Sequence, residues 1–254
     1  MLSRAYCAIV RGEFIRLFRI WKQTLLPPLI SSFLFFIVFG QVVGARLGST
    51  GGVSYMTFIA PGLILMGMIQ ASYGHVVFAF FSAKYQRSIE EFLIAPVSSS
   101  TIIFGYVTAG ILRGWLIGAL LTLMASCFTD LPFAHIPLLL LTLLLTTSAL
   151  ALAGFFNALF AKKFDDVSVV SDFILTPLTY FAGVFYAVER LSPLLQKISL
   201  FNPLLYIVQT TRYALIGVGE VSPSITLLVL VGLNILFFCI NLTFLRKRIG
   251  LSYG

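Results

Sequence analysis

Long apolar runs separated by short polar stretches dominate the chain from residue 24 onward. A helix needs about 20 mostly apolar residues to cross a bilayer. Four uncharged runs meet this requirement, at Thr24–Gly44, Thr57–Ala83, Ile136–Ala161 and Pro223–Leu245, and a fifth, Val170–Val188, has one charged residue, Asp172, near its beginning. A sixth run, Thr101–Phe128, meets it apart from one charged residue, Arg113. The pattern predicts an all-α membrane protein with a single six-span transmembrane domain over residues 24–248.

The composition is typical of a chain whose solvent is lipid. Of its 254 residues, 59% are hydrophobic and 10% are charged, whereas an ordinary soluble domain has roughly 25% charged residues. The mean hydropathy is +1.02. A soluble chain of this length has too little interior for so much apolar surface. The composition therefore excludes a soluble enzyme, a nucleic-acid-binding protein and a disordered chain.

The placement of positive charge predicts the orientation of the spans. Most of the 17 Lys and Arg residues fall at one set of helix ends. They are the five basic residues before Thr24, then Lys84 and Arg87, Lys162 and Lys163, and the cluster 246–248. Cytoplasmic loops carry the excess of Lys and Arg, so we expect both termini in the cytoplasm. The net charge of +8 reflects this topology and needs no nucleic acid to explain it.

The segment between Glu189 and Glu220 contains two apolar stretches that are too short to span. Treating Pro203–Gly217 as a seventh span would bury Arg212 and place the basic cluster 246–248 outside. We therefore expect short re-entrant helices that dip into the outer leaflet between spans five and six. Such backbone is tolerable only where protein or a water-filled cavity covers it.

Residues 1–23 are predicted to form an interfacial amphipathic helix. At 100° per residue, one face collects the basic side chains and the other collects apolar ones. Glu13 and Ile15 are the exceptions to this segregation. A basic face turned toward anionic lipid is typical of a helix lying in the headgroup layer. The alternative is a basic cytosolic tail.

The polar stretch after the second run, residues 84–96, is also amphipathic when drawn as a helix. Its two faces are an apolar stripe of Tyr85, Ile89, Phe92 and Leu93 and a polar face of Lys84, Arg87, Glu90 and Glu91. Pro96 ends it. A cytoplasmic helix continuous with two spans can transmit motion from a soluble partner. An ordinary loop helix remains the alternative.

Arg113 is an ionisable group in a predicted span, near the bilayer midplane, and such a group is costly enough to suggest a function. Next to it, the glycines at 110, 114 and 118 form two overlapping Gly-x-x-x-Gly patterns that let another helix approach closely. Candidate partners of Arg113 are Asp172, His75 and Gln70. The sequence leaves open whether Arg113 makes a structural pair or lines a polar substrate path. In the first run, Pro27 and Pro28 fit a helix's opening turn.

Nothing in the sequence resembles a catalytic or metal centre. His75 and His135 have no further His or Cys at metal-ligand spacing. The Asp165–Asp166 pair has no nucleophile beside it and is expected to lie in a solvated loop. The cysteines at 7, 127 and 239 do not make a disulfide framework, and we expect small core residues. No Gly-Lys dipeptide occurs, so the chain has no phosphate-binding loop of the Walker A type.

Two stretches carry a family resemblance. The first comprises Thr176–Tyr186 (TPLTYFAGVFY), Leu191–Gln196 (LSPLLQ), Phe201–Leu204 (FNPL) and Arg212, and the second is Ile89–Val97 (IEEFLIAPV). Together they resemble the permeases of type-2 ABC exporters. Within that family, the chain is similar to the small bacterial inner-membrane permeases of the Yad type, related to nodulation-factor and polysaccharide exporters. The resemblance covers essentially the whole chain.

The resemblance implies a working unit of two permease copies and two separate ATP-binding subunits in the inner membrane. Those subunits would bind ATP and Mg, so this chain would hold no cofactor. The unit would move a lipid-linked or amphipathic substrate outward. An ATP-independent channel or scaffold is the alternative.

The resemblance also implies roles for particular residues. ATPase coupling is assigned to Arg87, Glu90, Glu91 and Phe92, and an outer re-entrant gate to Pro193, Asn202, Pro203 and Arg212. Spans one and five would face the second copy. This places Pro177, Tyr180, Phe181, Phe185 and Tyr186 on the translocation path.

Overall fold

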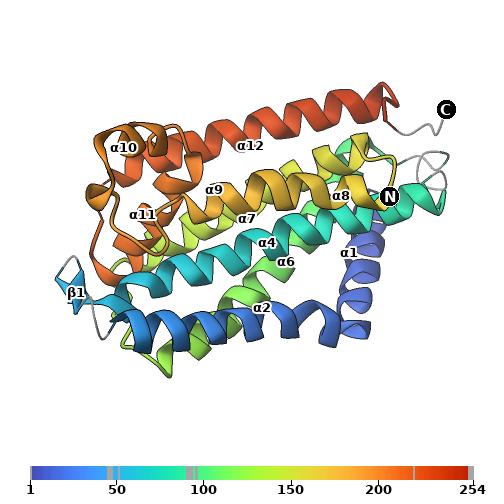
Figure 1. Ribbon diagram of the computed structural model, residues 1–254. Helices are drawn as coiled ribbons and strands as arrows, with labels where there is room; N and C mark the ends of the chain where they lie inside the picture. The colour runs from blue at the N-terminus through green and yellow to red at the C-terminus, as the bar shows by residue number, and fades with distance from the viewer. Residues whose placement is uncertain are drawn as a thin grey trace.

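The computed structural model describes residues 2–44, 48–50, 52–89, 94, 97–219 and 221–250. These residues form a helical bundle, with the short helix α1 set across one end (Figure 1). Five helices in the described part of the chain are long and apolar enough to cross a membrane. They are α2 (Trp21–Phe35) with its continuation η1 (Phe36–Val43), α4 (Tyr55–Tyr85), α6 (Ser99–Ser126), α7 (Ile136–Phe160) and α12 (Pro223–Arg246). The all-helical fold is therefore confirmed.

The predicted span at 170–188 has a different extent in the structure. Three segments follow one another without a break: α8 (Phe164–Val170), η2 (Ser171–Leu175) and α9 (Thr176–Tyr180). This run begins earlier than predicted and ends at Tyr180, because the chain then turns through Gly183, whose φ is +74°. It falls short of the length used for the five spans above. The six-span count accordingly stays a prediction.

Short helices follow this turn, in the region where re-entrant helices are predicted. They are η3 (Val188–Arg190), α10 (Pro193–Ser199) and α11 (Pro203–Ile216). A hairpin that the sequence did not reveal joins η1 to α4. Its strands β1 (Ser49–Thr50) and β2 (Val53–Ser54) pair antiparallel, with Ser49 opposite Ser54.

Helix α4 is the centre of the bundle and packs against α6 and α7. The glycine stripe on α6 makes this close packing possible, as predicted. A Cβ atom on Gly114 would lie 3.1 Å from the Cβ of Ser72 and 3.3 Å from the carbonyl oxygen of Met68. On α7, a Cβ atom on Gly154 would lie 2.6 Å from the carbonyl oxygen of Tyr73. Small residues at these positions bring the helix backbones together.

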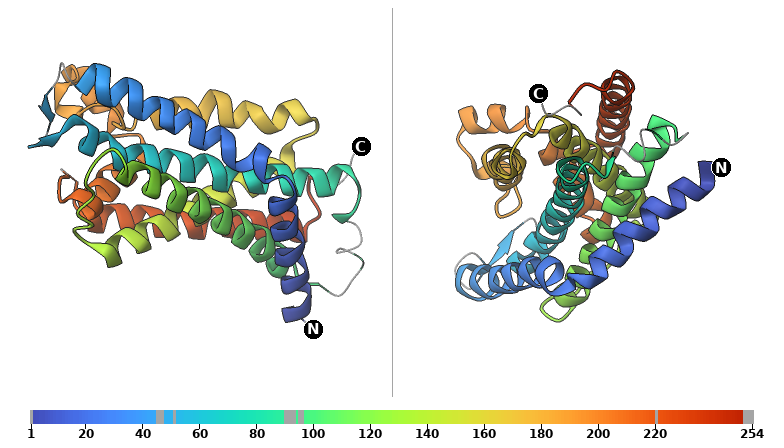
Figure 2. Two further views of the ribbon diagram at one scale, coloured as in Figure 1. Left: turned by 90° about the horizontal axis from the view of Figure 1, so that it is seen from below. Right: turned by 90° about the vertical axis from the view of Figure 1, so that its right-hand side faces the viewer.

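Helix α1 (Leu2–Arg19) runs across the end of the bundle and packs on α6 (Figures 1 and 2). Ile9 is buried against Gly105, and the Tyr6 hydroxyl donates a hydrogen bond of 2.9 Å to the Thr108 hydroxyl. The chain bends at Ile20 into α2. The helix predicted at the N-terminus is thus present, and its place in the headgroup layer remains a prediction.

Two expectations are wrong. Helix α2 begins at Trp21, so Pro27 and Pro28 lie inside it and not in its opening turn. The three cysteines are exposed, because they lie on outward surfaces of the bundle. Arg113 lies near the middle of α6, beside Gly114, whose neighbours Ser72 and Met68 lie near the middle of α4, and its depth in the membrane stays a prediction. Its guanidinium is 3.4 Å from the carbonyl oxygen of Thr24, near the beginning of α2.

Candidate functional site: the α1–α4 joint and the outer aromatic cluster

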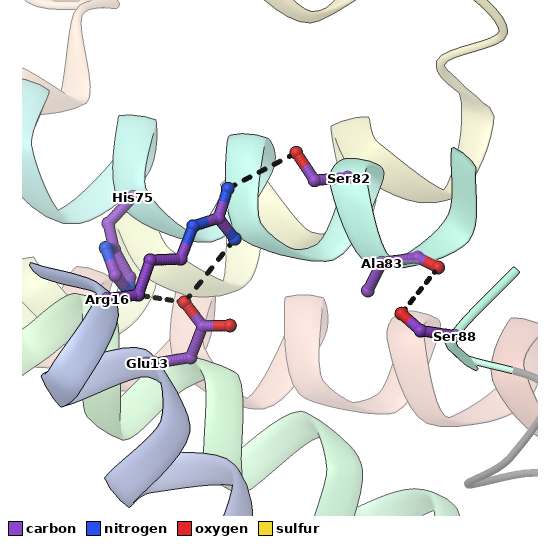
Figure 3. Close-up of polar contacts among 6 residues, drawn as sticks. All are labelled: Glu13, Arg16, His75, Ser82, Ala83 and Ser88. Carbon is purple, nitrogen blue, oxygen red and sulfur yellow. Dashed lines mark hydrogen bonds and ion pairs between the residues drawn. The ribbon is translucent and has the colours of Figure 1, made fainter. Parts of the chain in front are cut away.

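Helix α1 is attached to α4 by a group of polar side chains that we call the α1–α4 joint: Glu13, Arg16, His75 and Ser82 (Figure 3). The Glu13 carboxylate lies 3.5 Å from His75 Nε2 and 3.8 Å from the Arg16 guanidinium. Arg16 also donates to the Ser82 hydroxyl at 3.4 Å. Helix α1 thus contacts α4 at two levels about two turns apart, through a hydrogen bond at Ser82 and through the close approach of Glu13 to His75, which is not a hydrogen bond.

The Glu13–His75 part of the joint is shielded from solvent, whereas the Arg16 side chain is 42% exposed. His75 is buried, and Glu13 is set among apolar neighbours on the face of α1 that meets the bundle. Burial raises the pKa of the Glu13 carboxyl above its usual value, and the nearby Arg16 charge offsets this only in part. Glu13 was one of two exceptions to the helical-wheel pattern. The sequence thus contained the signal for this contact, but it did not identify the partner on α4.

The loop after α4 lies at the same end of the molecule. Lys84 and Tyr85 are the last residues of α4, and Arg87 is exposed with φ of +59°. A left-handed residue interrupts a helix, so the predicted helix cannot start at residue 84. The Ser88 hydroxyl donates to the Ala83 carbonyl at 3.1 Å, which closes the turn (Figure 3).

Further along this loop, Ile89 is buried and Ile94 is 86% exposed. The other coupling residues, Glu90, Glu91 and Phe92, lie outside the described residues. Lys84 does not belong to an exposed polar face as predicted. It is buried, and its ammonium donates three hydrogen bonds to carbonyls of residues 158, 159 and 161 at the end of α7.

At the opposite end of the bundle, the structure brings together two of the predicted path residues. Tyr180 and Phe185 are stacked with ring centroids 5.9 Å apart. Phe185 also contacts Phe35 and Phe39, at 5.4 and 4.7 Å. We call these four residues the outer aromatic cluster. The sequence did not identify Phe35 and Phe39. Of the remaining predicted path residues, Pro177 is exposed on α9, whereas Phe181 and Tyr186 are half-buried.

Residues of the predicted outer gate hold the short helices in place. Pro193 and Pro203 are the first residues of α10 and α11. The Asn202 side chain accepts a hydrogen bond from the Leu204 backbone N–H and donates to the Leu178 carbonyl.

Arg212 is 1% exposed and links α11 to two other segments. It donates to the carbonyl oxygens of Phe58 and Gly183, at 3.1 and 2.7 Å, and its guanidinium lies 3.8 Å from the Phe58 ring centroid. The sequence indicated this residue but not its burial.

Of the three predicted partners of Arg113, two lie near it in the structure and one does not. Asp172 is exposed on η2, and no ion pair joins it to Arg113 in the described part of the chain. Gln70 and His75 each line a cavity together with Arg113. Among the described residues, no group of three or more His, Cys, Asp or Glu side chains could hold a metal ion.

Comparison with known proteins decides the family. Residues 4–216 match the family model described as the ABC-2 type transporter. The chain belongs to the ABC-2 type transporter family. This permease is 44% identical to the inner membrane transport permease YadH of Escherichia coli strain K12, over 94% of the chain and 93% of the relative. It is 26% identical to nodulation protein J of Neorhizobium galegae, over 96% and 94%. The permease is therefore an inner-membrane transport protein of an ABC exporter and not itself an enzyme.

Proposed function

We propose that this permease moves a lipid-linked or otherwise amphipathic substrate outward across the cytoplasmic membrane, using ATP hydrolysis by a separate subunit. The working unit would contain two permeases and two ATP-binding subunits, which would also hold the ATP and Mg. Family membership and the absence of a Walker A sequence from this chain support the division of labour.

The proposal includes a six-span topology with both termini cytoplasmic. The end of α12 and helix α1 lie at the same end of the bundle (Figure 1), which requires an even number of crossings. The run from α8 to α9 extends along much of the bundle, beside α4 and α7 (Figure 1). Adding it to the five long helices gives six crossings.

The observation that carries the proposal is the α1–α4 joint at the same end as the loop after α4. Glu13 and Arg16 contact the C-terminal half of α4, and α4 packs extensively against both α6 and α7. A force applied to the loop or to α1 therefore reaches the centre of the bundle. In the proposed cycle, closure of the ATP-binding subunits moves residues 86–96 and tilts α4.

The apolar surface supports a two-copy assembly and an amphipathic substrate. Helix α2 and the run from α8 to α9 lie on the same side of α4 (Figure 2). Both present exposed apolar side chains, including Leu34 and Phe173 at 54% and 77% exposure. A second copy would cover this face. The outer aromatic cluster sits where the two segments meet. Ion paths instead use rings of carbonyl or carboxylate groups.

The test begins with the tagged permease extracted in mild detergent together with its co-purifying ATP-binding subunit. Replacing both acidic residues of the loop, Glu90→Gln with Glu91→Gln, should reduce permease-stimulated ATP hydrolysis to the rate of the ATP-binding subunit alone. The permease dimer should remain intact by size-exclusion chromatography. The matched control is Glu189→Gln, an exposed acid at the opposite end, which should leave stimulation unchanged.

Two results would contradict the proposal. Unchanged stimulation in the double variant would show that the loop is not the coupling element. A permease that purifies without any nucleotide-binding subunit in several mild detergents would favour a channel or scaffold.

A further inference from the structure

A cavity of about 290 Å³ lies between α2, α4 and α6. At roughly 30 Å³ per water molecule, this is the volume of about ten waters. The cavity has no role in the coupling described above. Its polar lining consists of Arg113 with Gln23, Thr24, Ser31, Ser32 and Gln70.

Arg113 has no anionic partner in the described part of the chain. No described carboxylate lies within 4.0 Å of its guanidinium. Glu13, on the neighbouring helix, lines a second cavity together with Arg113, but its closest basic groups are Arg16 and His75. The Nε atom of Arg113 is buried without a hydrogen-bond partner. A buried cation is costly unless it is paired and hydrogen-bonded, so the chemistry of the cavity calls for an anion.

Helix α2 is built to hold this guanidinium in place. The carbonyl of Thr24 would normally accept a hydrogen bond from the residue three or four positions later. Those residues are Pro27 and Pro28, which have no N–H. The carbonyl is therefore available to Arg113, whose Nη2 donates to it at 3.4 Å. A guanidinium has five N–H donors, so this single contact orients the group and leaves donors for a ligand.

The level and shape of the cavity indicate an amphiphile. The end of the cavity at Thr24 is close to α1, whose exposed basic residues we place among the lipid headgroups. Its far end is lined by Phe35 and Met66. The distance along α2 from Thr24 to Phe35 is about 16 Å at 1.5 Å per residue. The polar end at Thr24 would bind a charged headgroup, and the end at Phe35 and Met66 would bind the start of an apolar chain.

We propose that this cavity binds the phosphate group of an anionic amphiphile, with the Arg113 guanidinium as the main ligand and Gln70 and the serine hydroxyls as further donors. Phosphate suits the site because its oxygens accept parallel hydrogen bonds from a guanidinium. A membrane phospholipid and a phosphate-bearing substrate share this chemistry. The inference goes beyond the proposed function, since such a site can be occupied without ATP or the second subunit.

The experiment is native mass spectrometry of the full-length permease in a neutral detergent. The probes are dioleoyl phosphatidate, dioleoylglycerol, which lacks the phosphate, and inorganic phosphate as competitor. Phosphatidate should bind and dioleoylglycerol should not. Arg113→Gln should weaken phosphatidate binding by about tenfold, as expected for removing hydrogen bonds to a charged group. The matched control, Arg11→Gln, removes an exposed positive charge from α1 and should change binding less than about twofold.

Competition by inorganic phosphate tests whether the site recognises the phosphate alone or the whole lipid, and both outcomes support the site when binding depends on Arg113. Displacement by inorganic phosphate would show that the phosphate alone is recognised, whereas no displacement would show that the lipid chain contributes. Equal binding of dioleoylglycerol, or equal loss in Arg11→Gln, would overturn the proposal. If Arg113→Gln does not fold, Arg113→Lys and Gln70→Leu take its place. Undiminished phosphatidate binding in both would overturn it as well.

Discussion

Replacing Lys84 with methionine tests whether its ammonium stabilises the end of α7. The sequence places this lysine on the solvent face of a cytoplasmic helix, where the substitution should have little effect. In the structure, its side chain is 4% exposed, and its ammonium donates to three carbonyls at 2.7–2.8 Å. Two of those carbonyls belong to the last turn of α7, where no intrahelical donor remains for them, and the third is that of the C-cap residue Ala161.

The expected loss of stability in Lys84→Met follows from these three hydrogen bonds. A hydrogen bond to a charged group contributes about 1.5–3 kcal/mol. The three bonds share one ammonium, and its desolvation offsets part of their sum. We expect Lys84→Met to lower the free energy of unfolding by about 3 kcal/mol, within the range for a broken buried polar network. For a chain of this length, that corresponds to a decrease in Tm of about 6–12 °C.

The assay is the apparent Tm of the purified permease in detergent, followed by intrinsic tryptophan fluorescence at a fixed heating rate. A fixed rate is needed because membrane proteins of this kind commonly unfold irreversibly. The matched control is Lys162→Met, which removes the same charge from an exposed side chain close to the end of α7. Equal Tm values for Lys84→Met and the control would refute the reasoning, since they would show that the three bonds stabilise nothing.

Two further predictions concern packing and pH. Gly154→Ala should lower the free energy of unfolding by about 1–3 kcal/mol, and with it the apparent Tm, because its Cβ would lie 2.6 Å from the Tyr73 carbonyl oxygen. The control Gly74→Ala, with open space around its Cβ, should leave the apparent Tm unchanged. The Asp166 carboxylate accepts hydrogen bonds from two backbone amides, which lower its pKa below the usual 3.8. The stabilisation is therefore complete above pH 3.8 and is lost as the pH falls through the lowered pKa. The Tm difference between wild type and Asp166→Asn should disappear over that range, and a difference that persists, or one equal to that of Asp165→Asn, would contradict this.

The spans and the family could be predicted because they depend on local sequence. An apolar run of sufficient length predicts a membrane helix wherever it lies in the fold, and α4, α6, α7 and α12 begin and end close to the predicted runs. The fifth predicted span was less well delimited, because its end depends on the turn at Gly183. Glu13 stood out in the sequence as the acidic residue on an apolar face, which is the kind of exception that marks a contact.

The partners of the polar side chains could only come from the tertiary structure. His75 and Glu13 are 62 positions apart in the chain, and no local pattern encodes such a distance. The same holds for Phe185 with Phe35 and Phe39 in the outer aromatic cluster. Composition and periodicity report which residues can be buried, but not which surfaces meet.

Arg113 shows most clearly which features the sequence determined and which the tertiary structure decided. The sequence by itself determined that an arginine interrupts an apolar helix beside a stripe of glycines, and it placed that arginine near the bilayer midplane. The packing of α2 and α4 against α6 decided that the Arg113 guanidinium lies beside the Thr24 carbonyl and shares a cavity with Gln70. The groups that surround a side chain depend on how its helix packs against its neighbours, which the sequence along that helix does not encode.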